Sequence, residues 1–329
     1  MNFILNKCFI FPLLAILPII SLSSNSFFLN WMTLELNLIV FLSFMIINIK
    51  SFYKPSLIYF IIQSFSSSLF IFSSIIFLTF NNEFFKNLLL IFISISMLIK
   101  LNSFPFHSWM LKMIFYLNWT EFFILSTVQK LIPLSIMFHF KNKLMIYFAV
   151  MNLISGPLFM LGKSKIMEIL LFSSLNHLGW MLILIFSSIH LWFLYWYIYS
   201  IILFVMYMYM LKLNIFNLMD LINMFSLKSK IFILFIMLSL NGIPPFMGFI
   251  LKWMSIDILM IFNYSFLLMI IMMWSSLIIF FSYSKIMYLS ILTKSVLTKL
   301  IYQTKITNFS LLIIMFISTV NLFMLFFIF

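Results

Sequence analysis

Apolar runs of about 20 residues recur along the whole chain, and they limit its possible folds more than any other feature. A helix of that length crosses about 30 Å of hydrocarbon. In lipid the backbone must satisfy its own hydrogen bonds, so only helices and closed barrels can span a membrane. These runs are too long and continuous for barrel strands. The sequence therefore predicts an all-α, polytopic membrane protein.

The composition supports this prediction, with 65% hydrophobic and 8% charged residues and a mean hydropathy of +1.24. About a quarter of the residues in a soluble domain are charged, and this chain has too little polar surface to cover a globule. The first apolar run, Met1–Ile20, is followed at once by another and shows no small-residue cleavage pattern. We therefore interpret it as a span and not as a signal peptide.

Apolar runs and their polar interruptions predict about eleven spans. They are 2–20, 26–47, 56–80, 84–114 (broken), 119–139, 143–161, 166–187, 190–211, 229–250 (broken), 254–282 and 308–328. Lysines alternate with apolar residues between the last two spans. Residues 283–307 are therefore expected to form an inner-side loop or an interfacial helix, and 308–329 a terminal helix.

The lysines are distributed unequally between the two sides of the predicted topology. One side holds only Lys86, Lys141 and Lys143, whereas the other holds Lys7, Lys50, Lys54, Lys112, Lys163, Lys165, Lys212, Lys228, Lys230, Lys285, Lys294, Lys299 and Lys305. The positive-inside rule then places the N-terminus inside and the C-terminus outside. The same bias accounts for most of the net charge of +13, so we expect no nucleic-acid partner.

A single cysteine, Cys8, is present. One thiol cannot form an internal disulfide, an iron–sulfur site or a structural zinc site. We therefore expect no metal or redox centre in this chain.

Four charged residues lie inside or at the end of predicted spans: Glu35, Lys100, Lys130 and Lys252. A charge at the middle of a membrane helix costs roughly 2.5–3.5 kcal/mol on insertion scales, and such residues usually face the protein interior and mark ion or proton paths. A fixed structural ion pair is the alternative for Glu35. For Lys252 the alternative is snorkelling to the headgroups beside Trp253.

Two of these lysines lie next to a proline-induced gap in the helix. Pro105 and Pro133 each leave unbonded the carbonyl four residues earlier, and that carbonyl adjoins Lys100 or Lys130. The gap exposes a backbone acceptor, and room for water, beside an ammonium group. Two such arrangements in one chain are a more specific signal than one.

A third interruption precedes Lys252, where two glycines and two prolines fall within residues 238–250. This run cannot remain one continuous helix. An odd number of spans separates it from the break at Pro105, so the two broken helices are expected to run in opposite directions. That pattern is typical of inverted-repeat transporters. We expect one transmembrane domain over 1–329, with repeat halves at 1–140 and 141–282.

His177 lies early in a span, within the polar stretch Ser173–Trp180. Histidine can exchange protons near neutral pH. A hydrogen-bonded packing residue is the equally weighted alternative.

Five segments occur in an order that resembles a known family: Trp31–Asn37, Lys100–Trp109, Thr127–Pro133, Ser173–Trp180 and Leu238–Trp253. Together they resemble chain 2 of mitochondrial NADH–ubiquinone oxidoreductase, the respiratory complex I. That family is similar to cation/proton antiporter subunits, and it has an inverted repeat with two broken helices.

The resemblance implies a proton-translocating module without redox chemistry of its own. By analogy Glu35 and Lys100 form a coupled pair, Lys130 is the central relay, Lys252 belongs to the outlet side and His177 joins the polar axis. Two departures stand out. Asn102 replaces the usual glycine, and Leu251 replaces the proline that usually precedes the motif lysine.

The resemblance also implies partners and a location. NAD, FMN, iron–sulfur clusters and ubiquinone are expected elsewhere in the complex, and no cofactor in this chain. The expected partners are other membrane-arm subunits and the lipid bilayer, with cardiolipin as a candidate lipid. The expected location is the mitochondrial inner membrane, with the N-terminus in the matrix and the C-terminus in the intermembrane space.

Two alternatives remain from the residues alone. An autonomous cation/proton antiporter would need intramembrane Asp or paired carboxylates, whereas only Glu35 lies deep in a span. A passive scaffold would use the buried lysines only as structural partners.

Overall fold

The computed structural model describes residues 2–48, 53–79, 82–187, 189–222, 227–244, 246–261 and 264–292. Within these ranges every regular element is a helix, and the single extended contact is a bridge between Lys165 and Asn217. The chain divides into two compact units, Met1–Asn152 and Leu153–Phe329. Each unit is described separately.

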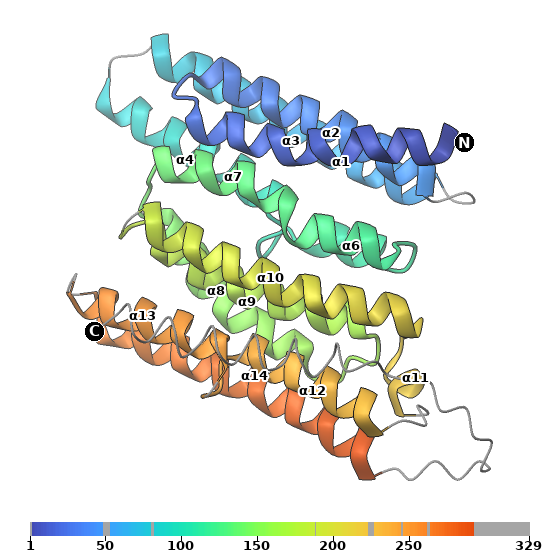
Figure 1. Ribbon diagram of the computed structural model, residues 1–329. Coiled ribbons are helices and arrows are strands. Elements are labelled where there is room, and N and C mark those ends of the chain that lie inside the picture. Colours follow the sequence, from blue (N-terminus) through green and yellow to red (C-terminus); the bar gives the residue numbers. More distant parts are fainter. Residues whose placement is uncertain are drawn as a thin grey trace. The chain divides into compact units, whose positions relative to one another are not determined.

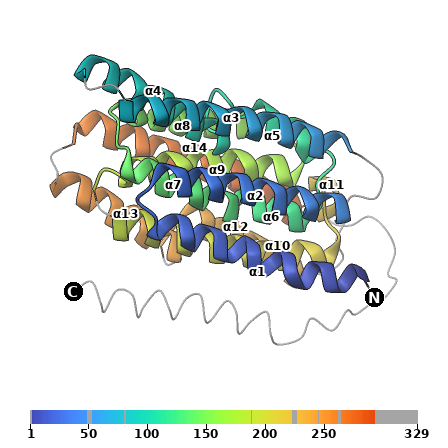
Figure 2. The same cartoon turned by 90° about the horizontal axis from the view of Figure 1, so that it is seen from above.

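Unit 1 is a bundle of helices (Figures 1 and 2). Its helices are α1 (Asn2–Ser23), α2 (Phe27–Asn48), α3 (Lys54–Thr79), α4 (Glu83–Lys100), α5 (Ser108–Ile114), α6 (Trp119–Ser126), α7 (Val128–His139) and the first part of α8 (Leu144–Met160). Helix α7 packs against α1, α2 and α4, and α3 packs against α2, α4 and α5. All residues from Gln129 to Met137 are buried, so this part of α7 lies inside the protein.

The described residues of unit 2 form the rest of α8 and six further helices (Figure 1). These are α9 (Ile166–Leu184), α10 (Ile189–Leu213), α11 (Leu218–Ile222), α12 (Leu227–Asn241), α13 (Met247–Ile261) and α14 (Phe266–Leu292). Helix α9 packs against α10 and α14, and every one of its residues is buried. A helix that is apolar all round and fully enclosed forms the core of a membrane bundle.

Six helices are long and apolar enough to cross a membrane, and three shorter apolar helices accompany them in the described part of the chain. Many of their outward side chains are large and apolar, including Phe28, Ile61 and Phe281. An apolar exterior of this kind suits a lipid environment. The prediction of an all-α, polytopic membrane protein is confirmed.

The predicted interruptions are present in both units. Helix α4 ends at Lys100 and α5 begins at Ser108, whereas α12 ends at Asn241 and α13 begins at Met247. The predicted boundary between spans 229–250 and 254–282 is wrong, because α13 continues to Ile261. Polar residues around Lys252 suggest a span end in the sequence. The Lys252 ammonium and the Ser255 hydroxyl are instead hydrogen-bonded to backbone carbonyls inside the protein.

Some predictions fall beyond the described ranges. The terminal span 308–328 and residues 293–307 lie outside them, while α14 continues to Leu292 and so includes Lys285. The inverted relation of halves 1–140 and 141–282 stays a prediction.

Candidate functional site

Lys100 is the last residue of α4, and the chain stops the helix there with a Schellman motif. The N–H of Ser103 donates to the carbonyl of Leu98 at 3.1 Å, and that of Asn102 to Ile99 at 3.3 Å. This motif needs a left-handed residue after the helix, which is usually glycine and sometimes asparagine. Asn102 has φ 60°, so asparagine meets the same backbone requirement as the family's usual glycine.

The interruption after α4 is fixed by two further polar contacts. The Phe104 N–H donates to Oδ1 of Asn152 on α8 at 2.6 Å, within unit 1. The Ser103 hydroxyl donates to the Leu98 carbonyl at 3.0 Å. The loop therefore has a defined conformation next to the Lys100 ammonium.

Glu35 of α2 and Lys100 of α4 each form a hydrogen bond with a residue of α3. The Ser67 hydroxyl donates to Oε1 of Glu35, and the Lys100 ammonium donates to the Gln63 carbonyl at 3.2 Å. Gln63 and Ser67 are one helical turn apart, so they lie on the same face of α3. The two charges interact electrostatically across this face.

Lys130 lies in the first turn of α7 and is only 2% exposed. Helices α6 and α7 meet at Thr127, whose φ of −120° and ψ of −75° depart from helical values. The hydroxyl of Thr127 donates to the Phe123 carbonyl at 2.7 Å. The helix is therefore interrupted before Lys130 at Thr127, whereas Pro133 remains inside α7.

A cluster of neutral polar groups adjoins Lys130. Gln129 exchanges two hydrogen bonds with Asn37 and accepts a third from the Tyr59 hydroxyl. Sequence reasoning missed this cluster. The available signal was that Asn37 and Gln129 are amides within apolar spans, where polar groups are rare unless they pair.

Lys252 is held by the second interruption. Its ammonium donates to the Asn241 carbonyl, the last of α12, at 2.5 Å and lies 5.6 Å from the ring centre of Trp180. The lysine is 6% exposed, and this inward contact disfavours snorkelling. Leu251 is an ordinary buried residue within α13, so the missing family proline leaves a continuous helix here.

Glycines allow the ends of α12 and α13 to meet. A Cβ on Gly248 would lie 1.9 Å from the Ser239 carbonyl oxygen, and Gly242 has φ 73°. No other residue fits either backbone without a shift. This close approach positions the Asn241 carbonyl for Lys252.

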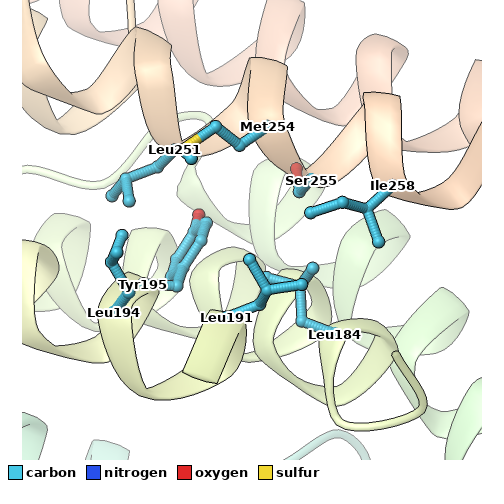
Figure 3. Close-up of a pocket in the computed structure, with 8 residues that line it drawn as sticks. All are labelled: Leu184, Leu191, Leu194, Tyr195, Leu251, Met254, Ser255 and Ile258. Atoms are coloured by element: carbon cyan, nitrogen blue, oxygen red, sulfur yellow. The ribbon is translucent and has the colours of Figure 1, made fainter. Parts of the chain in front are cut away.

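His177 is buried in α9 and paired with α10. Its Nδ1 is 2.8 Å from the Tyr195 hydroxyl, and its ring centre is 4.8 Å from that of Tyr199. Figure 3 shows Tyr195 beside residues of α13, including Leu251 and Ser255, around a small and mainly apolar pocket. His177 is thus hydrogen-bonded, which fits both a packing and a proton-transfer role.

The predicted site residues fall into two groups. Glu35, Lys100 and Lys130 belong to unit 1, and His177 and Lys252 belong to unit 2. Their assignment to proton transfer stays a prediction. In the described part of the chain, no group of three His, Cys, Asp or Glu residues could hold a metal ion.

Interrupted membrane helices, one in each unit and each beside a buried lysine, are typical of the antiporter-like class of membrane proteins. Residues 24–279 match the family described as NADH:quinone oxidoreductase/Mrp antiporter. Among curated relatives, NADH-ubiquinone oxidoreductase chain 2 of Rhipicephalus sanguineus is 37% identical over 276 residues, covering 84% of this chain and 86% of that protein. The Anopheles gambiae chain 2 is 33% identical over 306 residues, covering 89% of both. The chain belongs to the NADH-ubiquinone oxidoreductase chain 2 family, which confirms the resemblance.

Solved structures share the fold at low sequence identity. A chain of respiratory complex I from Thermus thermophilus is 15% identical, with a TM-score of 0.77, covering 94% of this chain and 76% of that one. A chain of an archaeal membrane-bound sulfane sulfur reductase is also 15% identical, with a TM-score of 0.81 and coverages of 97% and 73%. These likenesses support the fold.

Proposed function

We propose that this chain is a proton-translocating membrane-arm subunit of respiratory complex I. It is coupled to NADH oxidation and ubiquinone reduction in other subunits and contributes no redox centre. Family membership supports the assignment to the complex. The observation that carries proton transfer is the way in which the buried lysines are held.

Lys100 and Lys252 each donate a hydrogen bond to a backbone carbonyl, that of Gln63 or of Asn241. A carbonyl can accept from a neutral amine as well as from an ammonium, although the bond from the ammonium is the stronger, so either lysine can keep its partner when it releases a proton. A lysine bonded directly to a carboxylate would leave an unpaired buried charge on release, which is strongly unfavourable. The observed contacts therefore permit repeated protonation and deprotonation.

The proposed relay begins with Glu35 and Lys100, which separate or approach in response to quinone chemistry elsewhere. Their rearrangement changes the proton affinity of Lys130 through the local charge. Lys252 serves the outlet side, and His177 joins the central polar axis. Lysine suits these positions because burial readily makes it neutral, whereas arginine stays charged.

The proposed setting is the mitochondrial inner membrane, with the N-terminus in the matrix and the C-terminus in the intermembrane space. The unequal lysine distribution supports this orientation. Other membrane-arm subunits and the bilayer, with cardiolipin among its lipids, are the proposed partners.

Replacing Lys130 with methionine tests the relay. We expect NADH-driven proton translocation per NADH oxidised to fall, because methionine fills the site but cannot carry a proton. Lys130→Arg should also fail, because arginine stays protonated. Proton uptake and NADH oxidation would be measured together in membrane vesicles, with the amount of assembled complex read from native gels.

Lys112→Met provides the matched control, since Lys112 is an exposed residue of α5. It should leave proton yield and assembly unchanged. A normal proton yield in an assembled Lys130→Met complex would refute the relay and favour the passive scaffold.

A further inference from the structure

Three buried neutral side chains from three helices form a closed hydrogen-bond cluster in unit 1. The Asn37 amide donates to Oε1 of Gln129 at 2.6 Å, and the Gln129 amide donates back to Oδ1 of Asn37 at 3.2 Å. The Tyr59 hydroxyl donates to the same Oε1 at 3.2 Å. All three residues are at most 8% exposed. The cluster therefore ties α2, α3 and α7 together in a region without competing solvent.

The geometry of Gln129 fixes its side chain from two directions. Its carbonyl oxygen has both lone-pair positions occupied, by Asn37 and by Tyr59, and its amide nitrogen faces Asn37. A side chain held on two sides cannot change rotamer without breaking at least two hydrogen bonds. The orientation of this part of α7 is consequently coupled to α2 and α3.

Gln129 occupies the part of α7 that depends most on such contacts. It is the second residue of the helix, just beyond the non-helical Thr127 and directly before Lys130. The first N–H groups of a helix have no partner four residues earlier within it, and the Lys130 N–H bonds to the Thr127 carbonyl at 3.2 Å. The side-chain bonds of Gln129 add to this backbone bond in holding the turn. Displacing Gln129 would therefore turn or shift Lys130.

The other two members adjoin the Glu35–Lys100 site. Asn37 follows Glu35 by two residues on α2. Tyr59 lies one turn before Gln63, whose carbonyl accepts the bond from Lys100. A movement of α2 or α3 that accompanies a change at the charged pair would thus reach Gln129 through direct hydrogen bonds.

We propose that Gln129 is a positioning residue that, with Asn37 and Tyr59, transmits rearrangement of the Glu35–Lys100 pair to Lys130. The inference rests on the proposed relay and adds a mechanical link to it. None of the three groups needs to carry the proton. Amides do not titrate, and the tyrosine hydroxyl serves as a donor.

Gln129→Met tests the link, because methionine fills similar space without hydrogen bonds. We expect the proton yield per NADH oxidised to fall about fivefold, the low end of the range for coupling between sites. Tyr59→Phe should cause a smaller loss, because it removes one bond of three. Combined with Gln129→Met, it should add nothing further, since the acceptor of the Tyr59 hydroxyl is then already absent.

An exchange variant separates positioning from general packing. Asn37→Gln with Gln129→Asn keeps both amides and the combined side-chain length, but moves the longer residue to α2. Each single substitution should lower proton yield, and the exchange should restore most of it. Ser73→Ala is the control, because this buried hydroxyl of α3 bonds to carbonyls of its own helix and should leave the proton yield unchanged.

For every variant, the number of protons translocated per NADH oxidised would be measured on the assembled complex. Lys130→Met would be measured in the same experiment for comparison. A normal yield in Gln129→Met with an impaired Lys130→Met would overturn the positioning role and leave the relay intact. Normal yields in both would overturn the relay itself. Reduced assembly with an unchanged yield in the remaining complex would show a purely structural tie and would also overturn the proposal.

Discussion

The two interruptions, one in each unit, present a buried lysine in different ways. Lys100 precedes its interruption and ends the first half-helix, whereas Lys252 follows its interruption and reaches back to the last carbonyl of α12. The Lys252 bond is 2.5 Å long, and the Lys100 bond to the Gln63 carbonyl is 3.2 Å. In both cases the ammonium lies near the carboxyl end of a half-helix, where the helix dipole favours positive charge.

The two acceptor carbonyls also differ in their surroundings. The Asn241 carbonyl belongs to a helix end and has no partner in its own helix, so it needs Lys252. The Gln63 carbonyl lies in the middle of α3, where the helix already provides a donor. Lys100 thus shares its acceptor with α3 and has a carboxylate, Glu35, within electrostatic reach, whereas Lys252 bonds to a carbonyl at a helix end.

The close approach at the second interruption predicts the largest effect of substitution. In Gly248→Ala the new Cβ would fall 1.9 Å from the Ser239 carbonyl oxygen, and both atoms belong to helices. We expect destabilisation by about 3 kcal/mol or more, because the overlap can be relieved only by separating α12 from α13. Heat-induced loss of the complex in mild detergent, followed on native gels, would measure it.

Gly162→Ala is the control for this substitution. Gly162 has φ 84°, but a Cβ added there would meet no atom within 4 Å, so alanine adds backbone strain without overlap. It should lower the dissociation temperature less than Gly248→Ala. Equal effects would mean that the contact between α12 and α13 is not tight.

Gly242→Ala should give an intermediate effect. It combines φ 73° with a Cβ placed 2.6 Å from the Gly248 carbonyl oxygen. A left-handed alanine costs about 1–2 kcal/mol, and Gly242 lies in a loop that can shift to relieve part of the overlap. The same heating assay should place it between Gly248→Ala and Gly162→Ala. A dissociation temperature like that of the unaltered complex would argue against the left-handed turn.

Much of this architecture could be predicted from the sequence. The apolar runs predicted the helices, because a backbone in lipid must satisfy its own hydrogen bonds and a helix does so. The prolines and glycines predicted both interruptions. The predicted span boundary near Lys252 was wrong because this lysine is buried within α13. A lysine usually marks the end of a span, but the Lys252 ammonium donates a hydrogen bond to the carbonyl of Asn241, the last residue of α12.

The polar partners were harder to predict. Nothing in the spacing of Asn37, Tyr59 and Gln129 indicates that they meet, since α2, α3 and α7 approach one another only in the folded chain. The carbonyl partners of Lys100 and Lys252 are backbone groups, which every residue possesses. Sequence identifies the charged residues that need partners, and the fold selects those partners.

The first interruption should tolerate substitution far better than the second. Asn102 occupies a left-handed position, so Asn102→Ala should destabilise by about 1 kcal/mol, near the lower end for such a residue. Asn102→Gly should be close to neutral. It loses the contact of the Asn102 amide with Met110 Sδ, but glycine adopts this backbone without strain. A large loss of thermal stability in Asn102→Gly would show that the side chain, and not the backbone conformation, governs this position. The first interruption would then be no more tolerant of substitution than the second.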